Sequence, residues 1–387
     1  MCADGTSVKF RHLASVIAAL AVLLPVPPAM AAKRTTTDGP TLRVATYNVC
    51  KTTCKGGKWS WANRRGKVAN ILTALSADVI ATQETPTLPY NGTTQWADLA
   101  SLLRSRGLRI ASMQDGCTQG CTRDSHIYYN PATVEVVRGL LGPTDDPAPP
   151  DACMKYWNQR DDLYPRRRDP WYRDWYAYSC SRYMAWEPQE ERSTGMVSQE
   201  ELSDVDWGGI QDRNLSWAFM RHIATGKVFL MLSLHLPNEK TATGEQARRA
   251  VAGNLPAWAA ALSSSLGLPD IPVVVGGDLN SYKERQPSGA QAILGDAGYS
   301  DGFAAGERVN ERYATINKNG VINSRFGGWP AKPYKYNRPG TRIDYVFAKG
   351  VTPVRYEVFL RLRGDAFDER YRASDHNPVV TTWALPT

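Results

Sequence analysis

The sequence predicts an α/β (or α+β) fold in which two β-sheets pack face to face and helices cover them. Many strand-like segments alternate with few helix-like ones, at spacings of about 10 to 20 residues. Of the 387 residues, 42% are hydrophobic and 22% are charged. This composition is that of an ordinary globular protein and excludes disorder, collagen and coiled coil.

The first half of the chain begins with a strand pattern. Residues 42–49 alternate apolar and polar side chains, which predicts a strand, and residues 78–82 predict a short buried strand. Between them, the segment 61–75 has its apolar residues at helical spacing. Further elements are expected as a helix over 95–106, stopped by Gly107, and as strands over 108–114, 125–130 and 133–138.

The regular pattern breaks between residues 140 and about 212. The part from 151 to 186 contains ten aromatic residues, and the part from 187 to 212 contains eight acids and one base. A structureless loop of this length is unusual, so we interpret it as a functional or partly folded insertion.

The pattern then resumes to the end of the chain. A helix is expected over about 244–263, where apolar residues recur at helical spacing, with a bend at Pro256. The other expected elements are a helix over 291–298 and strands over 215–222, 227–236, 272–275, 342–348, 354–362 and 378–384.

The first 31 residues have the layout of a secretory signal peptide. Lys9 and Arg11 precede an apolar run over 13–24, and Ala29-Met30-Ala31 suits cleavage near Ala31. The run has 12 residues, whereas a membrane-spanning helix needs about 20. We therefore predict a secreted, extracellular protein with a linker over 32–40; an uncleaved membrane anchor is the alternative.

Six cysteines remain after removal of the predicted signal peptide, and they form three local pairs. Secretion favours disulfides at 50–54, 117–121 and 153–180 among the 15 possible connectivities. A zinc site from Cys50, Cys54, Cys117 and Cys121 remains the alternative, because the spacing of both pairs suits zinc.

Polar residues at the ends of predicted strands are the candidates for chemistry. Each alone could be an ordinary turn or core residue. Together they comprise two histidines, four carboxylates and two asparagines, which suit a hard, oxygen-ligated cation such as Mg²⁺ with histidines for proton transfer. They are Asn48, Glu84, His235, Asp278, Asn280, Asp344, Asp375 and His376.

Taken in order, these segments resemble the endonuclease/exonuclease/phosphatase superfamily. The most specific parts are Gly-Asp-Leu-Asn-Ser over 277–281 and Ser-Asp-His-Asn-Pro over 374–378, with Gln83-Glu84 upstream. The resemblance implies a four-layered sandwich of two mainly antiparallel or mixed sheets flanked by helices. It also implies one catalytic domain over 41–387, with the insertion at about 140–212.

The resemblance also implies a role for each candidate. Glu84 would be the principal metal ligand, with Asn48 and Asp375 close by. Asp278 would activate the attacking water, and Asn280 would help hold the water or the phosphate. The remaining implied roles concern the phosphate. His376, oriented by Asp344, would face the scissile phosphate. His235 would stabilise phosphoryl oxygens or assist the leaving group, and Arg213 would be a phosphate-facing cation. The cofactor expected is Mg²⁺, for which Mn²⁺ or Ca²⁺ could substitute.

The charge distribution bears on the substrate. The chain has a formal net charge of +8, which suits an anionic partner such as nucleic acid, phospholipid headgroups or a phosphate ester. Thirteen bases oppose six acids between 311 and 372, with interleaved aromatic residues that could stack on bases. We therefore expect a monomeric nuclease acting on nucleic acid.

Two alternatives stay open. The aromatic cluster over 151–186 could contact a membrane surface, as a sphingomyelinase would require, but it equally suits stacking on nucleic acid or the small core of a disulfide-linked subdomain. The first alternative is therefore a sphingomyelinase-like or inositol-phosphatase-like phosphoesterase. A binding or effector protein could keep the fold without catalysis, although the complete candidate set argues against this.

Overall fold

The structure is a computed structural model that describes most of the predicted catalytic domain. The described residues are 39–52, 54, 57–86, 89–111, 124–137, 193–283, 286–317, 341–363 and 366–386. The predicted signal peptide, the predicted pairs Cys117–Cys121 and Cys153–Cys180, and residues 140–192 of the predicted insertion lie outside them.

The first of two large sheets is a mixed seven-stranded sheet built around β1 (Thr41–Asn48). It runs parallel to β2 (Val79–Gln83) and antiparallel to β18 (Val379–Ala384). In spatial order the strands are β13 (Glu307–Val309), β15 (Thr352–Val358), β18, β1, β2, β6 (His126–Tyr129) and β5 (Arg109–Ile110).

The second large sheet repeats this local arrangement around β11 (Val273–Asp278). This strand is parallel to β10 (Val228–His235) and antiparallel to β14 (Asp344–Lys349). In spatial order the strands are β12 (Ser300–Asp301), β14, β11, β10, β9 (Asn214–His222) and β7 (Val134–Val136), with β8 (Thr194–Ser198) also paired to β9.

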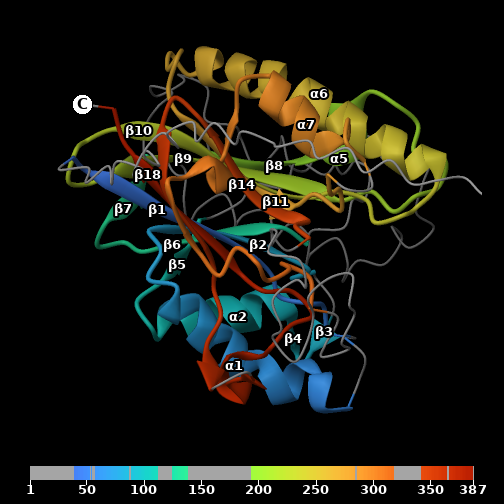
Figure 1. The fold of residues 1–387 in the computed structure, drawn as a ribbon, viewed down its shortest axis with the longest axis vertical. Helices are drawn as coiled ribbons and strands as arrows, with labels where there is room; N and C mark the ends of the chain where they lie inside the picture. Colours follow the sequence, from blue (N-terminus) through green and yellow to red (C-terminus); the bar gives the residue numbers. More distant parts are fainter. Residues whose placement is uncertain are drawn as a thin grey trace, which may run out of the picture. The chain divides into compact units, whose positions relative to one another are not determined.

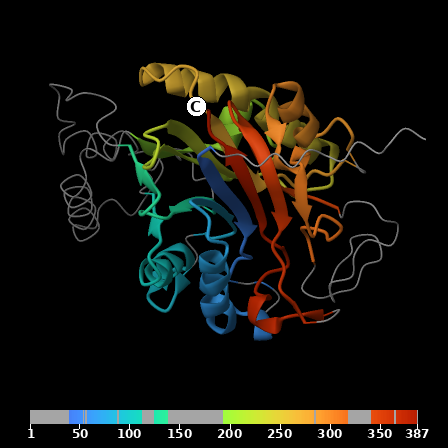
Figure 2. The same cartoon turned by 60° about the vertical axis from the view of Figure 1, so that its left-hand side comes forward.

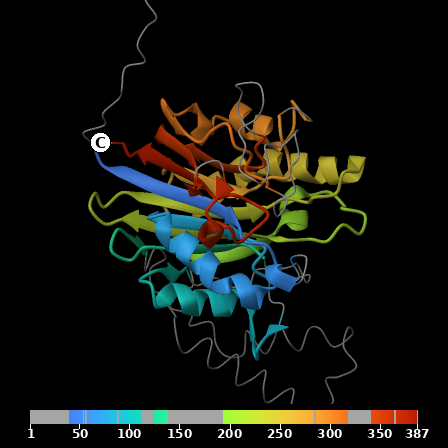
Figure 3. The ribbon, with the colours of Figure 1, turned by 60° about the horizontal axis from the view of Figure 1, so that its bottom comes forward.

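Helices cover the outer faces of the two sheets, which completes four layers (Figure 1). Helices α1 (Trp61–Ala74) and α2 (Gln95–Arg104) lie side by side on the first sheet, as Figure 3 also shows. On the opposite side, α6 (Ala242–Ser265) and α7 (Ala290–Asp296) lie on the second sheet (Figure 2). The predicted four-layered α/β sandwich is confirmed.

Side-chain alternation along the strands explains the layers. In β10, Phe229 and Met231 join the core between the sheets, whereas Leu230 and Leu232 join the core shared with α6. Successive side chains of a strand point to opposite faces, so a strand covered on both sides must be apolar at nearly every position. A third core lies between the first sheet and the helices α1 and α2.

The short elements were missed at the sequence level. They are the hairpins β3–β4 (Pro89–Tyr90 and Thr93–Thr94) and β16–β17 (Leu362–Arg363 and Ala366–Phe367), the edge strands β12 and β13, and the 3₁₀ turns η1 (Gly57–Trp59), η3 (Gly302–Ala304) and η5 (Glu369–Tyr371). Two or three residues carry too little periodicity to predict an element.

The structure describes only the last part of the predicted insertion at 140–212. Residues 193–212 contain β8 and the short helix α5 (Gln199–Ser203), and β8 is hydrogen bonded along its length to β9. This part is therefore regular structure of the second sheet. The sequence did not predict this strand, because β8 is short, alternates only weakly, and lies in an acidic part of the chain.

Helix α6 continues through Pro256 without interruption. Its first turn is capped by the Thr241 side chain, which accepts a hydrogen bond from the amide of Gly244 at 3.1 Å. Among the described residues, none of the helices has the length and apolar character needed to cross a membrane.

Gly277 of β11 lies where a side chain has no space. A Cβ there would lie 2.4 Å from the carbonyl oxygen of Leu234 on the paired strand β10. We expect Gly277→Ala to reduce the free energy of unfolding by about 1–3 kcal/mol, because the strand backbone must shift. Urea denaturation measures this; Gly295→Ala in α7, where a Cβ meets nothing within 4 Å, is the matched control and should not destabilise. Equal stabilities would contradict the packing.

Candidate active site

Strand register brings three candidate residues into one row on the second sheet. His235 is the register partner of Asp278 in the parallel pair β10–β11, and Asp278 is the partner of Asp344 in the antiparallel pair β11–β14. All three side chains are buried. The row lies where β10 and β11 end and β14 begins, so it forms one edge of the sheet.

The first sheet contributes Asn48 and Glu84 to the same place. Asn48 ends β1, and Glu84 directly follows β2 with a positive φ of 57°. The Asn48 amide nitrogen donates to Glu84 Oε1 and to Asp278 Oδ2, both at 3.1 Å. The second of these hydrogen bonds joins the two sheets directly.

Asp375 and His376 reach the site from the segment that precedes β18. Ser374 anchors this segment by donating its hydroxyl to the carbonyl oxygen of Asn48 at 2.7 Å. His376 then places Nδ1 at 2.9 Å from Asp344 Oδ2 and Nε2 at 3.8 Å from Asp278 Oδ2. Asp375 is half-buried, whereas His376 is buried.

His376 and Asp344 form a buried charge pair. Burial raises the pKa of Asp344 to about 6, against the attraction of His376. Burial alone would lower the pKa of His376, but the contact with Asp344, and then the charges of Asp278 and Asp375, raise it well above 6.5. The imidazole therefore holds its proton at neutral pH and presents Nε2 as a hydrogen-bond donor beside Asp278.

His235 has its own carboxylate partner, Asp124, which the sequence reasoning missed. Asp124 Oδ2 lies 2.9 Å from His235 Nδ1, while His235 Nε2 lies 3.5 Å from Asp278 Oδ2. Asp278 is thus flanked by two histidines, each oriented by an aspartate. Asp124 lies just before β6, so the rule of polar residues at strand ends could have found it.

Asn214 of β9 holds Asp124 in position. Its side-chain oxygen accepts hydrogen bonds from the amides of Asp124 and Ser125, at 2.8 and 3.1 Å. Asn214 is completely buried, so these bonds fix the turn before β6.

Arg213 and Asn280 both contact the strand end beside His235. Arg213 Nη1 and Asn280 Nδ2 each donate to the carbonyl oxygen of Leu236 at 3.0 Å. Arg213 Nε also lies 4.0 Å from Asp124 Oδ2, and the Asn280 amide donates to Asp278 Oδ1 at 2.9 Å. Both side chains are half-buried at the rim.

Glu84 is held in its charged form. Burial would raise its pKa, but interaction with His235 and His376 and hydrogen bonds from Asn48 and the Lys51 amide lower it to about 2. The Lys51 amide donates to Glu84 Oε2 at 3.1 Å, so both carboxylate oxygens are engaged. An ionised carboxylate beside an amide and a second carboxylate is a donor set that fits a hard divalent cation.

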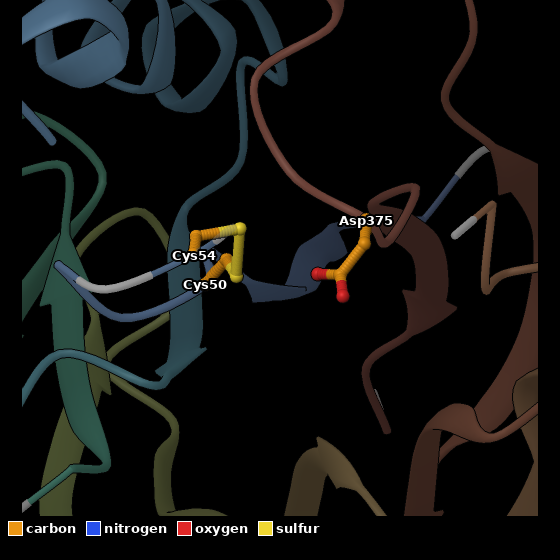
Figure 4. Close-up of side chains that lie close together, drawn as sticks. All are labelled: Cys50, Cys54 and Asp375. Carbon is orange, nitrogen blue, oxygen red and sulfur yellow. A yellow bond between two sulfur atoms is a disulfide. The ribbon is translucent and has the colours of Figure 1, made fainter. Parts of the chain in front are cut away.

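The described residues contain two clusters with the spacing of metal ligands. One comprises Cys50, Cys54 and Asp375, whose sulfur and oxygen atoms lie within 4.8 Å of one another (Figure 4). Cys50 and Cys54 form a disulfide, as predicted, so neither offers a thiolate. This also argues against the alternative zinc site.

The other cluster comprises Asp278, Asp344 and His376. Since His376 Nδ1 is bound to Asp344, the oxygen ligands left for a cation on this side are those of Asp278. Asn48 turns its amide nitrogen toward the carboxylates, while its oxygen accepts from the Cys50 amide at 3.0 Å. In this orientation, the Asn48 amide positions the carboxylates of Glu84 and Asp278. Its role as a metal ligand stays a prediction.

We expect Asp124→Asn to lower kcat about tenfold or more. The imidazole of His235 would lose the charged partner of Nδ1, and a positioned proton donor contributes about 10²- to 10⁴-fold to catalysis. Initial rates on a diester substrate measure the loss. Glu135→Gln, which removes an exposed carboxylate on β7 paired with Arg221, is the control. A wild-type kcat for Asp124→Asn would contradict the role.

Comparison with known proteins shows which family the C-terminal part of the chain resembles. Residues 233–376 match the sequence model of the Endonuclease/Exonuclease/phosphatase family. No curated protein matches the chain. Residues 233–376 therefore resemble the Endonuclease/Exonuclease/phosphatase family, as the motifs in this part of the chain indicated.

Solved structures show the same fold. An endonuclease/exonuclease/phosphatase family protein from Bacteroides thetaiotaomicron superposes with a TM-score of 0.55 at 19% identity, covering 90% of this chain and 99% of that one. A mannosyl-6-phosphatase from Bacteroides thetaiotaomicron VPI-5482 gives 0.54 at 18% identity, covering 88% and 98%. A family protein from Bacteroides vulgatus gives 0.55 at 17% identity, covering 90% and 100%.

Proposed function

We propose that the protein is a metal-dependent phosphodiester hydrolase that acts on nucleic acid. One observation carries this proposal: the Asp278 carboxylate lies between two histidines, each bound to its own aspartate, with Asn48 and Glu84 directly beside it. This arrangement joins a base, two proton donors and an anionic pocket for a cation, which are the parts that phosphodiester hydrolysis needs.

Asp278 is the base in this mechanism. Its Oδ2 accepts a hydrogen bond from Asn48, and Oδ1 accepts one from the Asn280 amide. The carboxylate is thereby fixed, and it orients the attacking water and takes its proton. Asn280 borders the same position and helps hold the water or a phosphoryl oxygen.

The histidines act on the phosphate. His376 donates from Nε2 to a phosphoryl oxygen, since its Nδ1 is held by Asp344. His235, held by Asp124, donates to the leaving oxygen or to a second phosphoryl oxygen, and Arg213 at the rim adds positive charge.

Glu84 and Asp375, with Asn48 and Asp278 nearby, are the residues that would hold the cation. Mg²⁺ fits these oxygen donors, and Mn²⁺ or Ca²⁺ could replace it. When bound, such a cation supplies charge shielding for the phosphoryl group.

Nucleic acid is the proposed substrate because cationic side chains precede Asp375. In the described part of the basic stretch, Arg361, Arg363 and Arg370 have side chains 45%, 71% and 70% exposed. Asp368 pairs with the last two and Glu357 pairs with Arg361, so these three arginines face two carboxylates. Exposed arginines in the segment that leads to Asp375 favour a polyanionic substrate, whose binding should weaken as salt rises.

A substrate panel tests the proposal. Plasmid DNA, RNA, sphingomyelin vesicles, mannose 6-phosphate and bis(4-nitrophenyl) phosphate are each incubated with Mg²⁺ or with EDTA. We expect cleavage of DNA or RNA in the presence of Mg²⁺ and no cleavage in the presence of EDTA. Cleavage of sphingomyelin or of the sugar phosphate without cleavage of nucleic acid would contradict nucleic acid as the substrate. No turnover of any of these compounds would favour a non-catalytic binding protein.

We also propose that the protein is secreted, with cleavage near Ala31. The charged start, the 12-residue apolar run and the small residues at 29 and 31 support this. Mass spectrometry of the protein from culture medium tests it: the mature N-terminus should fall close to residue 32. Full-length protein retained in cells would contradict it.

A further inference from the structure

Arg64 of α1 is a buried cation that binds backbone carbonyl groups. Its side chain is inside the protein, with the residue 1% exposed. Among the described residues, no carboxylate forms an ion pair with it; its hydrogen bonds go to the carbonyl oxygens of Val49, Cys50, Lys51, Trp59 and Ala373.

Three of these carbonyl groups belong to the turn that follows β1. The amides of the same turn point the other way, toward the site. The Cys50 amide donates to Asn48 Oδ1 at 3.0 Å, and the Lys51 amide donates to Glu84 Oε2 at 3.1 Å. Holding the carbonyl oxygens on one side therefore aims the amides at Asn48 and Glu84 on the other side.

Arg64 also reaches the segment that carries Asp375. Its Nη1 donates to the carbonyl oxygen of Ala373 at 3.1 Å. The next residue, Ser374, donates its hydroxyl to the Asn48 carbonyl oxygen at 2.7 Å. One guanidinium group thus joins two segments, 49–51 and 373–375, which are more than 300 residues apart in the chain.

The turn needs such support because its backbone is unusual. Cys50 and Glu84 have φ values of 59° and 57°, in the left-handed region that non-glycine residues seldom occupy. Gln95 adds to the support by donating to the carbonyl oxygens of Cys50 and Glu84, at 3.0 and 3.3 Å. The Cys50–Cys54 disulfide closes the same turn.

A guanidinium group suits this position better than an ammonium group. It presents five donors in a rigid plane, whereas lysine offers three from one atom. Burial lowers the pKa of Arg64 to about 10, against the attraction of Tyr47, Asp375 and Glu84, so the group remains charged at neutral pH. A fixed positive charge behind the carboxylates also limits their mutual repulsion.

We propose that Arg64 is a positioning residue for the cation site, which holds the turn 49–51 and the segment 373–375 so that Glu84, Asn48 and Asp375 converge. This inference rests on the proposed function, because it assumes that these residues bind a divalent cation. Arg64 itself touches neither substrate nor cation.

Manganese titration followed by electron paramagnetic resonance tests the inference without any turnover. Arg64→Met and Arg64→Lys should each raise the dissociation constant for Mn²⁺ by about 10- to 100-fold, the range for residues that support metal ligands. The kcat at saturating Mn²⁺ should fall by a smaller factor, since the Asn280 backbone amide still holds Asp278 and the two histidines keep their aspartates.

Arg248 of α6 provides the matched control. It too is fully buried, and it donates to the carbonyl oxygens of Pro237 and Glu239 at 2.7 and 2.8 Å. Arg248→Met should lower stability and leave the Mn²⁺ dissociation constant unchanged. An equal loss of Mn²⁺ affinity in Arg248→Met would show a general effect of instability and would overturn the inference.

The remaining outcomes are also decisive. If Arg64→Met does not fold, the decision rests on Arg64→Lys and on Gln95→Leu, which removes the other support of the turn. Folded variants at position 64 with wild-type Mn²⁺ affinity would overturn the inference while leaving the proposed function intact. Wild-type protein that binds no Mn²⁺ and hydrolyses no diester would overturn both.

Discussion

Asp278→Asn is expected to lower kcat for phosphodiester hydrolysis by about 10³-fold or more. Asparagine keeps the size and the hydrogen bond accepted from Asn280, but it cannot take a proton from water, and a positioned base contributes about 10²- to 10⁴-fold. The carboxylate is also the point where Asn48 of one sheet meets the other sheet, so its charge organises both halves of the site. Initial rates with bis(4-nitrophenyl) phosphate and Mg²⁺ measure this loss.

The fold of this variant should remain intact. Circular dichroism should match that of the wild type, and the free energy of unfolding should fall by only about 1–3 kcal/mol, because the amide nitrogen is isosteric but cannot accept the buried hydrogen bond from Asn48. A variant that is folded and fully active would remove Asp278 from the mechanism. If this variant does not fold, the variants of His376 and Asp344 described next test the mechanism instead.

His376→Ala is expected to reduce kcat by about 10²- to 10⁴-fold, because the phosphoryl group loses a charged donor. Asp344→Asn should cost less, since the imidazole remains but loses the partner that raises its pKa. The double variant should be no worse than His376→Ala alone, because the aspartate acts only through the histidine.

Steady-state rates of the four proteins form the thermodynamic cycle for this pair. Costs that add in the double variant would mean that Asp344 and His376 act independently, against the 2.9 Å contact between them. The urea midpoint of each variant serves as the control for folding.

Several features of the site could be predicted because they follow from strand order. Asn48 ends β1 and Glu84 follows the parallel strand β2, so they share an edge of the first sheet; His235 and Asp278 share an edge of the second sheet for the same reason. Asp344 joins them because β14 is antiparallel and begins at that edge. The long helices and strands were predictable for a similar reason, since their periodicity extends over enough residues.

Other features depend on tertiary contacts that leave no local signal. Asp124 directly precedes a predicted strand and so could have been a candidate, but its pairing with His235, 111 residues later, depends on how the two sheets pack. Arg64 looks like one more basic residue on an amphipathic helix until the turn after β1 folds over it. Strand β8 is recognisable only by its pairing with β9, since its own sequence alternates weakly.

We propose that this site hydrolyses phosphodiesters with the help of a divalent cation. The most direct test is the rate of bis(4-nitrophenyl) phosphate hydrolysis by wild-type protein stripped with EDTA, before and after Mg²⁺ is restored. We expect no turnover above background in the stripped protein and recovery of activity as Mg²⁺ saturates the site. Turnover that is unaffected by EDTA, or absent at every Mg²⁺ and Mn²⁺ concentration, would contradict it.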